Sequence, residues 1–455
     1  MATALTSDLG KFISGLRYRD IPADAVAVIQ AGFTDCVGVM IAGAEESAPQ
    51  LLKSMLAPAG GEATLLFGAG RASALDAAWI NSTAAHALDL DDVSQRGEHP
   101  SAVMVPAILA EAETMGASGE QMVTAYAAGY ETCAELVRRD PDYHHNKGWH
   151  PTGIFGVIGA AAACASLHGL DAEKAAIAIA IGASQSAGLT SNFGTMTKPF
   201  HAGRAAHAGV ASARLAKIGF TASPDALEHP PGFLHAVSAA GRIDLDSPIE
   251  AGSEWKLLRI GLTIKKYPLC FGTHRALDGM LDMLDANRID PARVSRVTVS
   301  VSPRIVTLLR NHAPQNGLEA KFSMEFAMAS ALMAGRAGLA ELKDDFVRRP
   351  DVQALMKRVT MTPDDRDDPS APGYAIQDRV TVETSDGGRF DSGPVTKVRG
   401  GPDLPLNRDE LWAKFEDCIK LGTAPVPARK LFDALMSLDR LPHVREIPGL
   451  AACRT

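Results

Sequence analysis

Apolar positions along the first 262 residues recur with the spacing of helices. Residues 23–42 are an example, with Val26, Ile29 and Phe33 on a broad apolar surface. Alanine-dense runs follow, and they predict further helices over residues 73–87, 104–115, 121–138, 153–168, 172–187 and 202–217. Small residues on every face indicate that these helices are buried and closely packed.

The pattern changes after Leu262. Residues 293–301 alternate as in a half-buried strand, and residues 358–362 are a second strand candidate. Residues 380–390 are typical of a β-hairpin with its turn at 385–388. Helices are expected between these strands, at 274–287 and 323–333, so this segment is α+β.

Helices return at 408–420 and 427–437, after a connection rich in glycine and proline at 400–405. We expect these last helices to pack back on the first helical region. The length of 455 residues exceeds one ordinary domain, so two domains are the first expectation.

Composition narrows the class of protein. Apolar residues make up 46% and charged residues 22%, which is typical of a soluble globular chain. The net charge of −8 argues against a nucleic-acid partner, so any cationic site must be local. Apolar runs such as 154–167 are too short to span a bilayer, and residues 1–10 do not resemble a signal peptide. Six scattered cysteines favour a reduced, cytoplasmic protein and suggest neither a zinc site nor a disulfide framework.

Two near-identical segments stand at the heads of apolar runs: His99-Pro100-Ser101-Ala102 and His150-Pro151-Thr152-Gly153. Proline suits the first helical position and keeps the preceding residue out of helical geometry. We therefore expect His99 and His150 just before helix starts, where free N–H groups and the helix dipole favour an anion. There a histidine can hold a carboxylate or move a proton. The plainer interpretation is a helix entry with an exposed ring.

The segment 197–204 places Lys198, His201 and Arg204 among small residues. Burying a long cation there is costly without an anionic partner. Few acids are nearby in sequence, so a bound anion is the natural candidate.

Asp89-Leu90-Asp91-Asp92 offers three carboxylates in four residues. They could bind magnesium, or they could cap a helix and orient nearby histidines. We favour a structural or proton-relay role for Asp89.

Lys265 and Lys266 lie where the helical region ends, and two adjacent lysines suit a substrate with several carboxylates. The alternative is a solvated hinge. Cys270 is either an acid or base or a small buried side chain, and Tyr143 is either a pocket wall or an ordinary half-buried tyrosine. No dinucleotide fingerprint, P-loop or serine-hydrolase elbow occurs in the sequence.

Taken together, these motifs resemble the MmgE/PrpD family, which includes 2-methylcitrate dehydratase, cis-aconitate decarboxylase and iminodisuccinate epimerase. The resemblance covers nearly the whole chain. Its carriers, in order, are the segments 86–92, 99–101, 148–152, 192–199 and 266–268.

The resemblance implies a mainly α fold: a large all-helical domain, residues 1–264 plus 400–455, with an inserted α+β lid domain, residues 265–399. It implies an active site between the domains, no metal or organic cofactor, and a homodimer. The positions that match the family's active-site pattern are Asp89, His99, His150, Lys198 and Lys265.

We interpret His99 and His150 as the proton-transfer pair. Lys198 and Lys265 would hold substrate carboxylates, and Lys198 could also donate a proton. Asp89 would orient a histidine, while Cys270 would line the pocket. The resulting prediction is a hydro-lyase of the 2-methylcitrate dehydratase type, acting on a small di- or tricarboxylate.

Several alternatives stay open. Cys270, Phe326 and Val93 stand where decarboxylases carry histidine, tyrosine and threonine, which argues against itaconate-type decarboxylation. The segments 195–199 and 268–270 look more like the epimerase branch. Outside the family, the rivals are an all-helical magnesium enzyme using Asp89, Asp91 and Asp92, with a second cluster at 364–368, and a non-catalytic helical scaffold.

Overall fold

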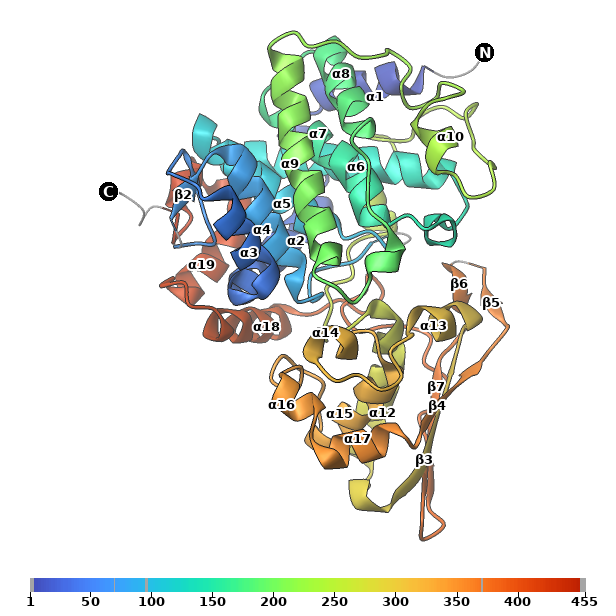
Figure 1. Ribbon diagram of the computed structural model, residues 1–455. Helices are drawn as coiled ribbons and strands as arrows, with labels where there is room; N and C mark the ends of the chain where they lie inside the picture. The colour runs from blue at the N-terminus through green and yellow to red at the C-terminus, as the bar shows by residue number, and fades with distance from the viewer. Residues whose placement is uncertain (1–3, 69, 95–96, 370, 451–455) are drawn as a thin grey trace. The chain divides into compact units, whose positions relative to one another are not determined.

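The computed structural model describes residues 4–68, 70–94, 97–369 and 371–450. The chain divides into two compact units (Figure 1). Unit 1 comprises residues 1–264 and 407–455, and unit 2 comprises residues 265–406. The second boundary is expected at 399/400 from the sequence, whereas residues 400–406 group with unit 2. The predicted mainly α class is confirmed.

Unit 1 is helical apart from a two-stranded ribbon of β1 (Ala63–Thr64) and β2 (Arg71–Ala72), as far as the described residues show. Its α-helices are α1 (Leu5–Gly15), α2 (Ala23–Ala42), α3 (Ser47–Leu56), α4 (Ala74–Ala87), α5 (Pro100–Met115), α6 (Gly119–Arg139), α7 (Pro151–Leu167), α8 (Ala172–Ala183), α9 (Thr197–Lys217), α10 (Phe233–Val237), α11 (Lys256–Arg259), α18 (Arg408–Leu421) and α19 (Ala428–Leu435).

Several helix boundaries differ from the ranges that the apolar periodicity predicts. α5 begins at Pro100, as its His-Pro motif predicts but before residue 104. α9 begins at Thr197 instead of residue 202, because proline is tolerated in a first helical turn. α8 ends at Ala183 instead of residue 187. The early start of α9 places Lys198 and His201 in its first turns, on the same side of the helix.

Glycine lets the central helices approach closely. α9 packs against both α4 and α7 (Figure 1). A side chain at Gly203 would collide with Thr83 Oγ1 on α4, and one at Gly209 would collide with Ala160 on α7. The small residues of the sequence therefore fix the position of α9, and with it the position of Lys198.

α2 is the one described helix long and apolar enough to cross a membrane by length and composition alone. Of that apolar window, 78% is buried within the protein, as in the core helix of a globular unit. α18 packs along α2, and the missing side chain of Gly38 makes room for the Phe415 ring. α18 thereby packs back on the first helical region, as expected from the sequence.

Unit 2 is built on a four-stranded sheet in the order β4-β3-β7-β8. β3 (Val294–Val301) pairs parallel with β4 (Val359–Pro363) and antiparallel with β7 (Arg379–Thr384), which pairs with β8 (Arg389–Asp391). Val297, Val299 and Val301 are buried, as the alternation predicts. α12 (His274–Ala286) contacts β7, and α15 (Met324–Ala334) contacts β4.

The remaining elements of unit 2 are short: α13 (Pro303–Leu308), α14 (Gly317–Ala320), α16 (Asp344–Val347), α17 (Pro350–Met356), β5 (Asp367–Asp368) and β6 (Ala371–Ala375).

Candidate active site

The loop between α4 and α5 carries the acidic motif, and we call residues 88–94 the acid loop. Asp89 adopts a left-handed backbone conformation, with φ of 53°. The left-handed conformation is uncommon for residues other than glycine, although aspartate tolerates it better than most. The bend lets neighbouring carboxylates point in different directions.

Asp91 holds two histidines at once. Its carboxylate oxygens lie 3.0 Å from His86 Nδ1, on the last turn of α4. One of them also lies 2.8 Å from His99 Nδ1, at the N-cap of α5. Burial alone would raise the pKa of Asp91, but the charges of the two histidines and their hydrogen bonds hold it well below its usual value. An ionised Asp91 therefore makes Nδ1 the protonated nitrogen of both rings, leaving Nε2 as an acceptor.

Lys198 connects the acid loop to these histidines. Its Nζ lies 3.0 Å from Asp89 Oδ1 and 3.0 Å from His86 Nε2. The side chain is buried and passes over the Phe193 ring, 5.5 Å from Nζ to the ring centroid. A lysine ammonium donates only, so His86 Nε2 accepts from it, in agreement with the tautomer that Asp91 imposes.

A second histidine pair adjoins the first. His150, at the N-cap of α7, has its Nδ1 3.1 Å from His201 Nδ1 on α9. The His150 ring stacks 5.8 Å from the His86 ring and meets Phe193 edge-on at 4.9 Å. The predicted positions of His99 and His150 just before helix starts are confirmed, and neither side chain caps its own helix.

Burial and the nearby ammonium keep three of these rings neutral. Burial lowers the pKa of His86 to about 4, against the pull of Asp91 and with the help of Lys198. Burial, then His86 and Lys198, lower the pKa of His201 to about 4. Burial first and Lys198 second lower the pKa of His150 well below its usual value. At neutral pH these three imidazoles around the Lys198 side chain are therefore neutral.

Asp92 turns away from this cluster. Ser101 bonds to its carboxyl group from the backbone N–H, 3.2 Å from Oδ1, and from the hydroxyl, which also contacts Tyr126 Oη at 2.7 Å. Burial raises the pKa of Asp92 to about 8, and the nearby Asp35 and Asp91 add to the rise. At neutral pH Asp91 is therefore ionised, whereas its neighbour Asp92 is protonated.

His86, Asp89, Asp91 and His99 offer ligand atoms within 4.8 Å of one another, a spacing that could hold a metal ion. Lys198 Nζ, however, already bonds to His86 Nε2 and Asp89 Oδ1. A metal ion would have to displace the Lys198 side chain, because Lys198 Nζ already occupies the position beside these two ligand atoms. The three-aspartate magnesium hypothesis also fits poorly, because Asp92 is bound to Ser101 on a separate side.

Four of the sequence-predicted site residues, Asp89, His99, His150 and Lys198, come together in unit 1. The expected role of Asp89 in orienting a histidine stays a prediction. Asp89 Oδ1 lies 3.9 Å from His99 Nε2, whereas Asp91 makes the close contacts to both rings.

Lys265 and Cys270 belong to unit 2, where both are buried. Of the two adjacent lysines, Lys265 is turned inward and Lys266 is exposed. Cys270 donates its backbone N–H to the Lys321 carbonyl, at 2.8 Å. Phe326 lies in the core of unit 2, with its ring 6.4 Å from Phe346.

Tyr143 is half-buried in unit 1, just before the 3₁₀ turn His144–Lys147. Its ring packs 6.3 Å from His145, which in turn meets Phe193 at 6.1 Å. Because Phe193 contacts both His150 and Lys198, a chain of rings joins Tyr143 to the cluster.

Sequence reasoning gave no catalytic or positioning role to His86 or His201, and it named Asp91 only among the acids that could bind magnesium or orient nearby histidines. His86 carried a signal, because a histidine near the end of an apolar helix and five residues before an acid can be paired with it. His201 follows Lys198 by three residues, which is helical spacing, but the helix was expected to begin after it.

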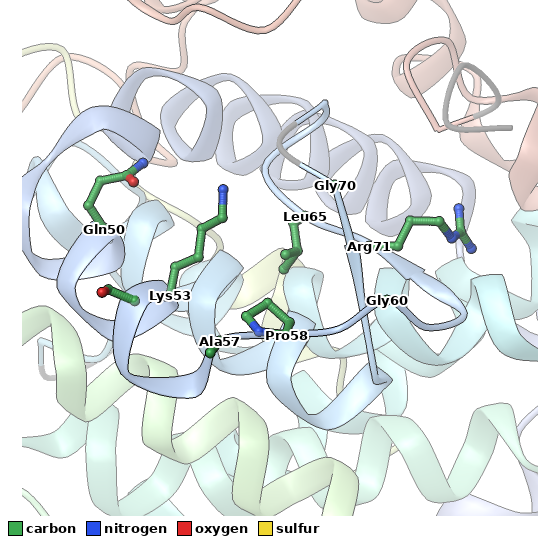
Figure 2. Close-up of a pocket in the computed structure, with 9 residues that line it drawn as sticks. Gln50, Lys53, Ala57, Pro58, Gly60, Leu65, Gly70 and Arg71 are labelled. Carbon is green, nitrogen blue, oxygen red and sulfur yellow. The ribbon is translucent and has the colours of Figure 1, made fainter. Parts of the chain in front are cut away.

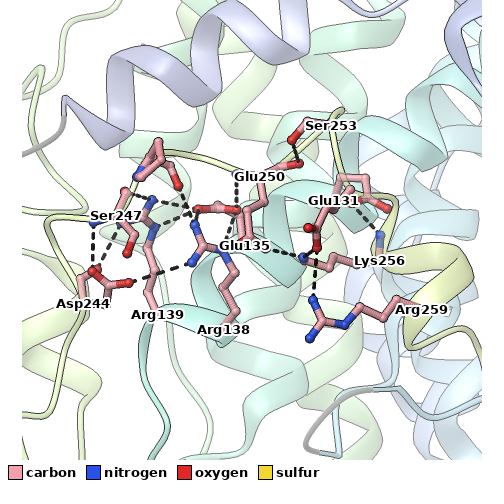
Figure 3. Close-up of polar contacts among 12 residues, drawn as sticks. Glu131, Glu135, Arg138, Arg139, Asp244, Ser247, Glu250, Ser253, Lys256 and Arg259 are labelled. Atoms are coloured by element: carbon pink, nitrogen blue, oxygen red, sulfur yellow. Dashed lines mark hydrogen bonds and ion pairs between the residues drawn. The ribbon is translucent and has the colours of Figure 1, made fainter.

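A polar network on α6 fixes the segment that pairs with the acid loop. On α6, Glu135 pairs with Arg138 and Arg139, and Glu131 accepts the backbone N–H groups that begin α11 (Figure 3). These contacts fasten the segment that leads to residues 261–263. There Thr263 and Val93 exchange backbone hydrogen bonds of 2.8 and 2.9 Å.

A separate pocket of about 660 Å³ opens on unit 1 between α3 and the β1–β2 ribbon (Figure 2). Among the described residues that line it, the titratable side chains are Lys53 and Arg71, and Arg71 donates to the Gly61 and Glu62 carbonyls. Neither a histidine nor a carboxylate is among those described lining residues, so they lack the acid–base groups found in the histidine cluster.

A buried ammonium, paired with a carboxylate and surrounded by neutral histidines in a helical unit, defines an acid–base site of the kind found in enzymes. The chain belongs to the MmgE/PrpD family. The family's N-terminal domain model matches residues 7–246, and its C-terminal domain model matches residues 267–439.

The chain is similar to proteins named as cis-aconitate decarboxylases or as decarboxylase-like. A cis-aconitate decarboxylase of Homo sapiens is 27% identical over 351 residues, covering 74% of this chain and 71% of that protein. The Mus musculus cis-aconitate decarboxylase is 26% identical over 74% of this chain and 70% of its own length. A cis-aconitate decarboxylase-like protein of Aspergillus oryzae is 24% identical over 98% of this chain and 97% of its own length. These similarities support an enzyme with a lyase-type role.

Proposed function

We propose that this protein is a cofactor-independent lyase of small di- or tricarboxylates, with dehydration of a hydroxy acid as its first candidate reaction. The observation that carries the proposal is Lys198, whose buried ammonium is bonded both to Asp89 and to the neutral ring of His86. Removing a proton or a carboxyl group next to a carboxylate builds negative charge on the substrate. A preorganised ammonium stabilises such charge by several kcal/mol.

His99 has the geometry of a general base. Asp91 binds its Nδ1, so Nε2 is the nitrogen that can take a proton from a carbon beside a carboxylate. In dehydration the C–H electrons form the double bond, the C–O bond breaks, and the hydroxyl leaves as water after receiving a proton. Lys198, or a histidine protonated during the cycle, is the candidate donor of that proton.

Decarboxylation is the second candidate, because three relatives are named for cis-aconitate decarboxylation or likeness to it. In that reaction a C–C bond breaks, carbon dioxide leaves, and the remaining carbanion takes a proton from the same groups. Cys270, Phe326 and Val93 argue against it, because the family resemblance implies histidine, tyrosine and threonine at these positions in decarboxylases. Iminodisuccinate-type epimerisation is a third outcome, which product analysis separates from the other two.

The proposal includes a homodimer, which the family resemblance supports, and a reduced, cytoplasmic setting, which the scattered cysteines favour. The cysteines among the described residues, Cys36, Cys133, Cys164, Cys270 and Cys418, are buried thiols outside any disulfide. Sedimentation of the purified protein tests the dimer.

Proton NMR in deuterated water tests the reaction, using chelator-treated enzyme with 2-methylcitrate, citrate, cis-aconitate and iminodisuccinate. A new alkene from a hydroxy acid establishes a hydro-lyase. Citrate would give a vinyl proton signal, whereas 2-methylcitrate would give a new allylic methyl signal when the double bond forms at its methyl-bearing carbon, because that alkene carries no proton. A vinyl product together with carbon dioxide from cis-aconitate establishes a decarboxylase. Deuterium exchange with inversion of the substrate and no new alkene establishes an epimerase. Loss of all activity on chelation, restored by a divalent metal, would contradict the cofactor-independent mechanism.

A further inference from the structure

We infer that Lys414, on helix α18, is a positioning residue for the acid loop, an inference that rests on the proposed function. Its Nζ donates to the Leu90 carbonyl at 2.8 Å and lies 2.5 Å from Asp35 Oδ1 on α2. The Lys414 side chain is 9% exposed and that of Asp35 is 2% exposed. Both side chains are therefore buried in the interior of unit 1.

Leu90 lies between Asp89 and Asp91, so a hydrogen bond to its carbonyl can fix the backbone that carries both aspartates. Asp89, on one side, is in a left-handed conformation and binds Lys198. Asp91, on the other side, binds both His86 and His99. A left-handed non-glycine residue persists only when its surroundings fix it. Rotation of the peptide that joins Leu90 to Asp91 would reorient the Asp91 carboxylate relative to that of Asp89, and the bond from Lys414 opposes that rotation.

The position of Lys414 is itself fixed. α18 approaches α2 closely, because a side chain at Gly38 would come within 2.8 Å of the Phe415 ring. Asp35 lies on α2 and supplies the counter-charge that a buried ammonium needs. The ion pair therefore anchors the cation, and the anchored cation holds the loop.

The rival interpretation is that the Asp35–Lys414 pair only stabilises the packing of α18 on α2. The two interpretations differ for the double variant Asp35→Leu/Lys414→Met. Replacing both members of a buried ion pair with apolar residues of similar size is often neutral for stability. A purely structural pair would then leave activity intact, whereas a positioning lysine would not.

Steady-state kinetics on the substrate that the NMR panel identifies gives the first readout. We expect Lys414→Met and the double variant to lower kcat about 10- to 100-fold with KM changed less than about threefold, because small misplacements of catalytic groups cost rates of this size. Lys414→Arg should recover most of the loss. The matched control is Lys420→Met on the same helix, where an exposed lysine pairs with Glu416 at 2.7 Å. A double variant with wild-type kcat would overturn the inference.

Hydrogen exchange of the ligand-free protein gives a second readout that does not depend on the reaction. The double variant should speed exchange in peptides covering residues 88–94 at least about fivefold, while peptides of α6 stay unchanged. If wild-type enzyme converts none of the four substrates, the proposed function fails and this readout alone decides the inference. Unchanged exchange across residues 88–94 would overturn it.

Discussion

Lys198 and Asp89 form a buried ion pair, with 3.0 Å between Nζ and Oδ1, across 109 positions of the sequence. Lys198 also bonds to His86, so one ammonium joins the acid loop to the histidines. Removing one partner of such a pair leaves an uncompensated buried charge. Changes at Lys198 should therefore affect both chemistry and the order of the loop.

We expect Lys198→Met to lower kcat/KM at least about 100-fold, because it removes the cation bonded to Asp89 and His86. The matched control is Lys217→Met, an exposed lysine on the last turn of the same helix. Progress curves on the identified substrate measure the difference. A Lys198→Met enzyme with nearly normal activity would remove the central element of the proposed mechanism.

Asparagine should have very different effects at two adjacent positions. In Asp91→Asn the amide NH₂ would face the Nδ1–H of either His86 or His99, and two donors cannot bond to each other. One of the two rings would therefore lose its tautomer, and kcat should fall about 10²- to 10⁴-fold. Asp92→Asn replaces a carboxyl whose raised pKa keeps it neutral, and the amide can still bond to Ser101. Its kcat should stay within about fivefold of wild type. Equal losses in the two variants would contradict the assignment of protonation.

The pH dependence of stability tests Asp92 directly. The pKa of its carboxyl is raised by burial from an ordinary value of 3.8 to about 8 in the fold. Between these values the folded state binds one more proton than the unfolded state, so this group's contribution to stability falls as pH rises. The unfolding free energy of Asp92→Asn, relative to wild type, should therefore rise by up to about 1.4 kcal/mol per pH unit.

Urea unfolding of wild type and Asp92→Asn at about pH 5 and about pH 7.5 measures this change. The histidines titrate in both proteins, so their contributions cancel in the difference. A difference in unfolding free energy that is the same at both pH values would show that Asp92 is ionised throughout.

His201 should be replaceable by a residue that keeps its hydrogen bond. At neutral pH His201 is uncharged, because its pKa is lowered to about 4, and its Nδ1 contacts His150. Asparagine places an amide atom near the position of Nδ1, so His201→Asn should retain kcat within about threefold, whereas His201→Leu should lose about 10- to 100-fold. Equal kinetics for the two variants would show that this bond does not position His150.

Local rules predicted the helix starts at the site but not the contacts made there. The prolines after His99 and His150 fix the N-termini of α5 and α7, which is a local steric effect. The choice of Asp91 over Asp89 as the histidine partner depends on the left-handed turn at Asp89, which the sequence does not signal.

The start of α9 is another feature that sequence reasoning missed. It was expected at residue 202, yet proline is tolerated in the first turn and the helix begins at Thr197. The sheet of unit 2 was easier to predict, because the alternating valines of β3 report burial of one face directly.

The division of unit 1 between residues 1–264 and 407–455 has a consequence for biosynthesis. The ribosome must produce the whole of unit 2 before Lys414 and Phe415 emerge. At roughly 5–20 residues per second, this takes roughly 8 to 30 seconds. During that time the face of α2 around Gly38 has no partner helix, so the nascent chain carries an exposed apolar stripe that a chaperone could shield until α18 arrives.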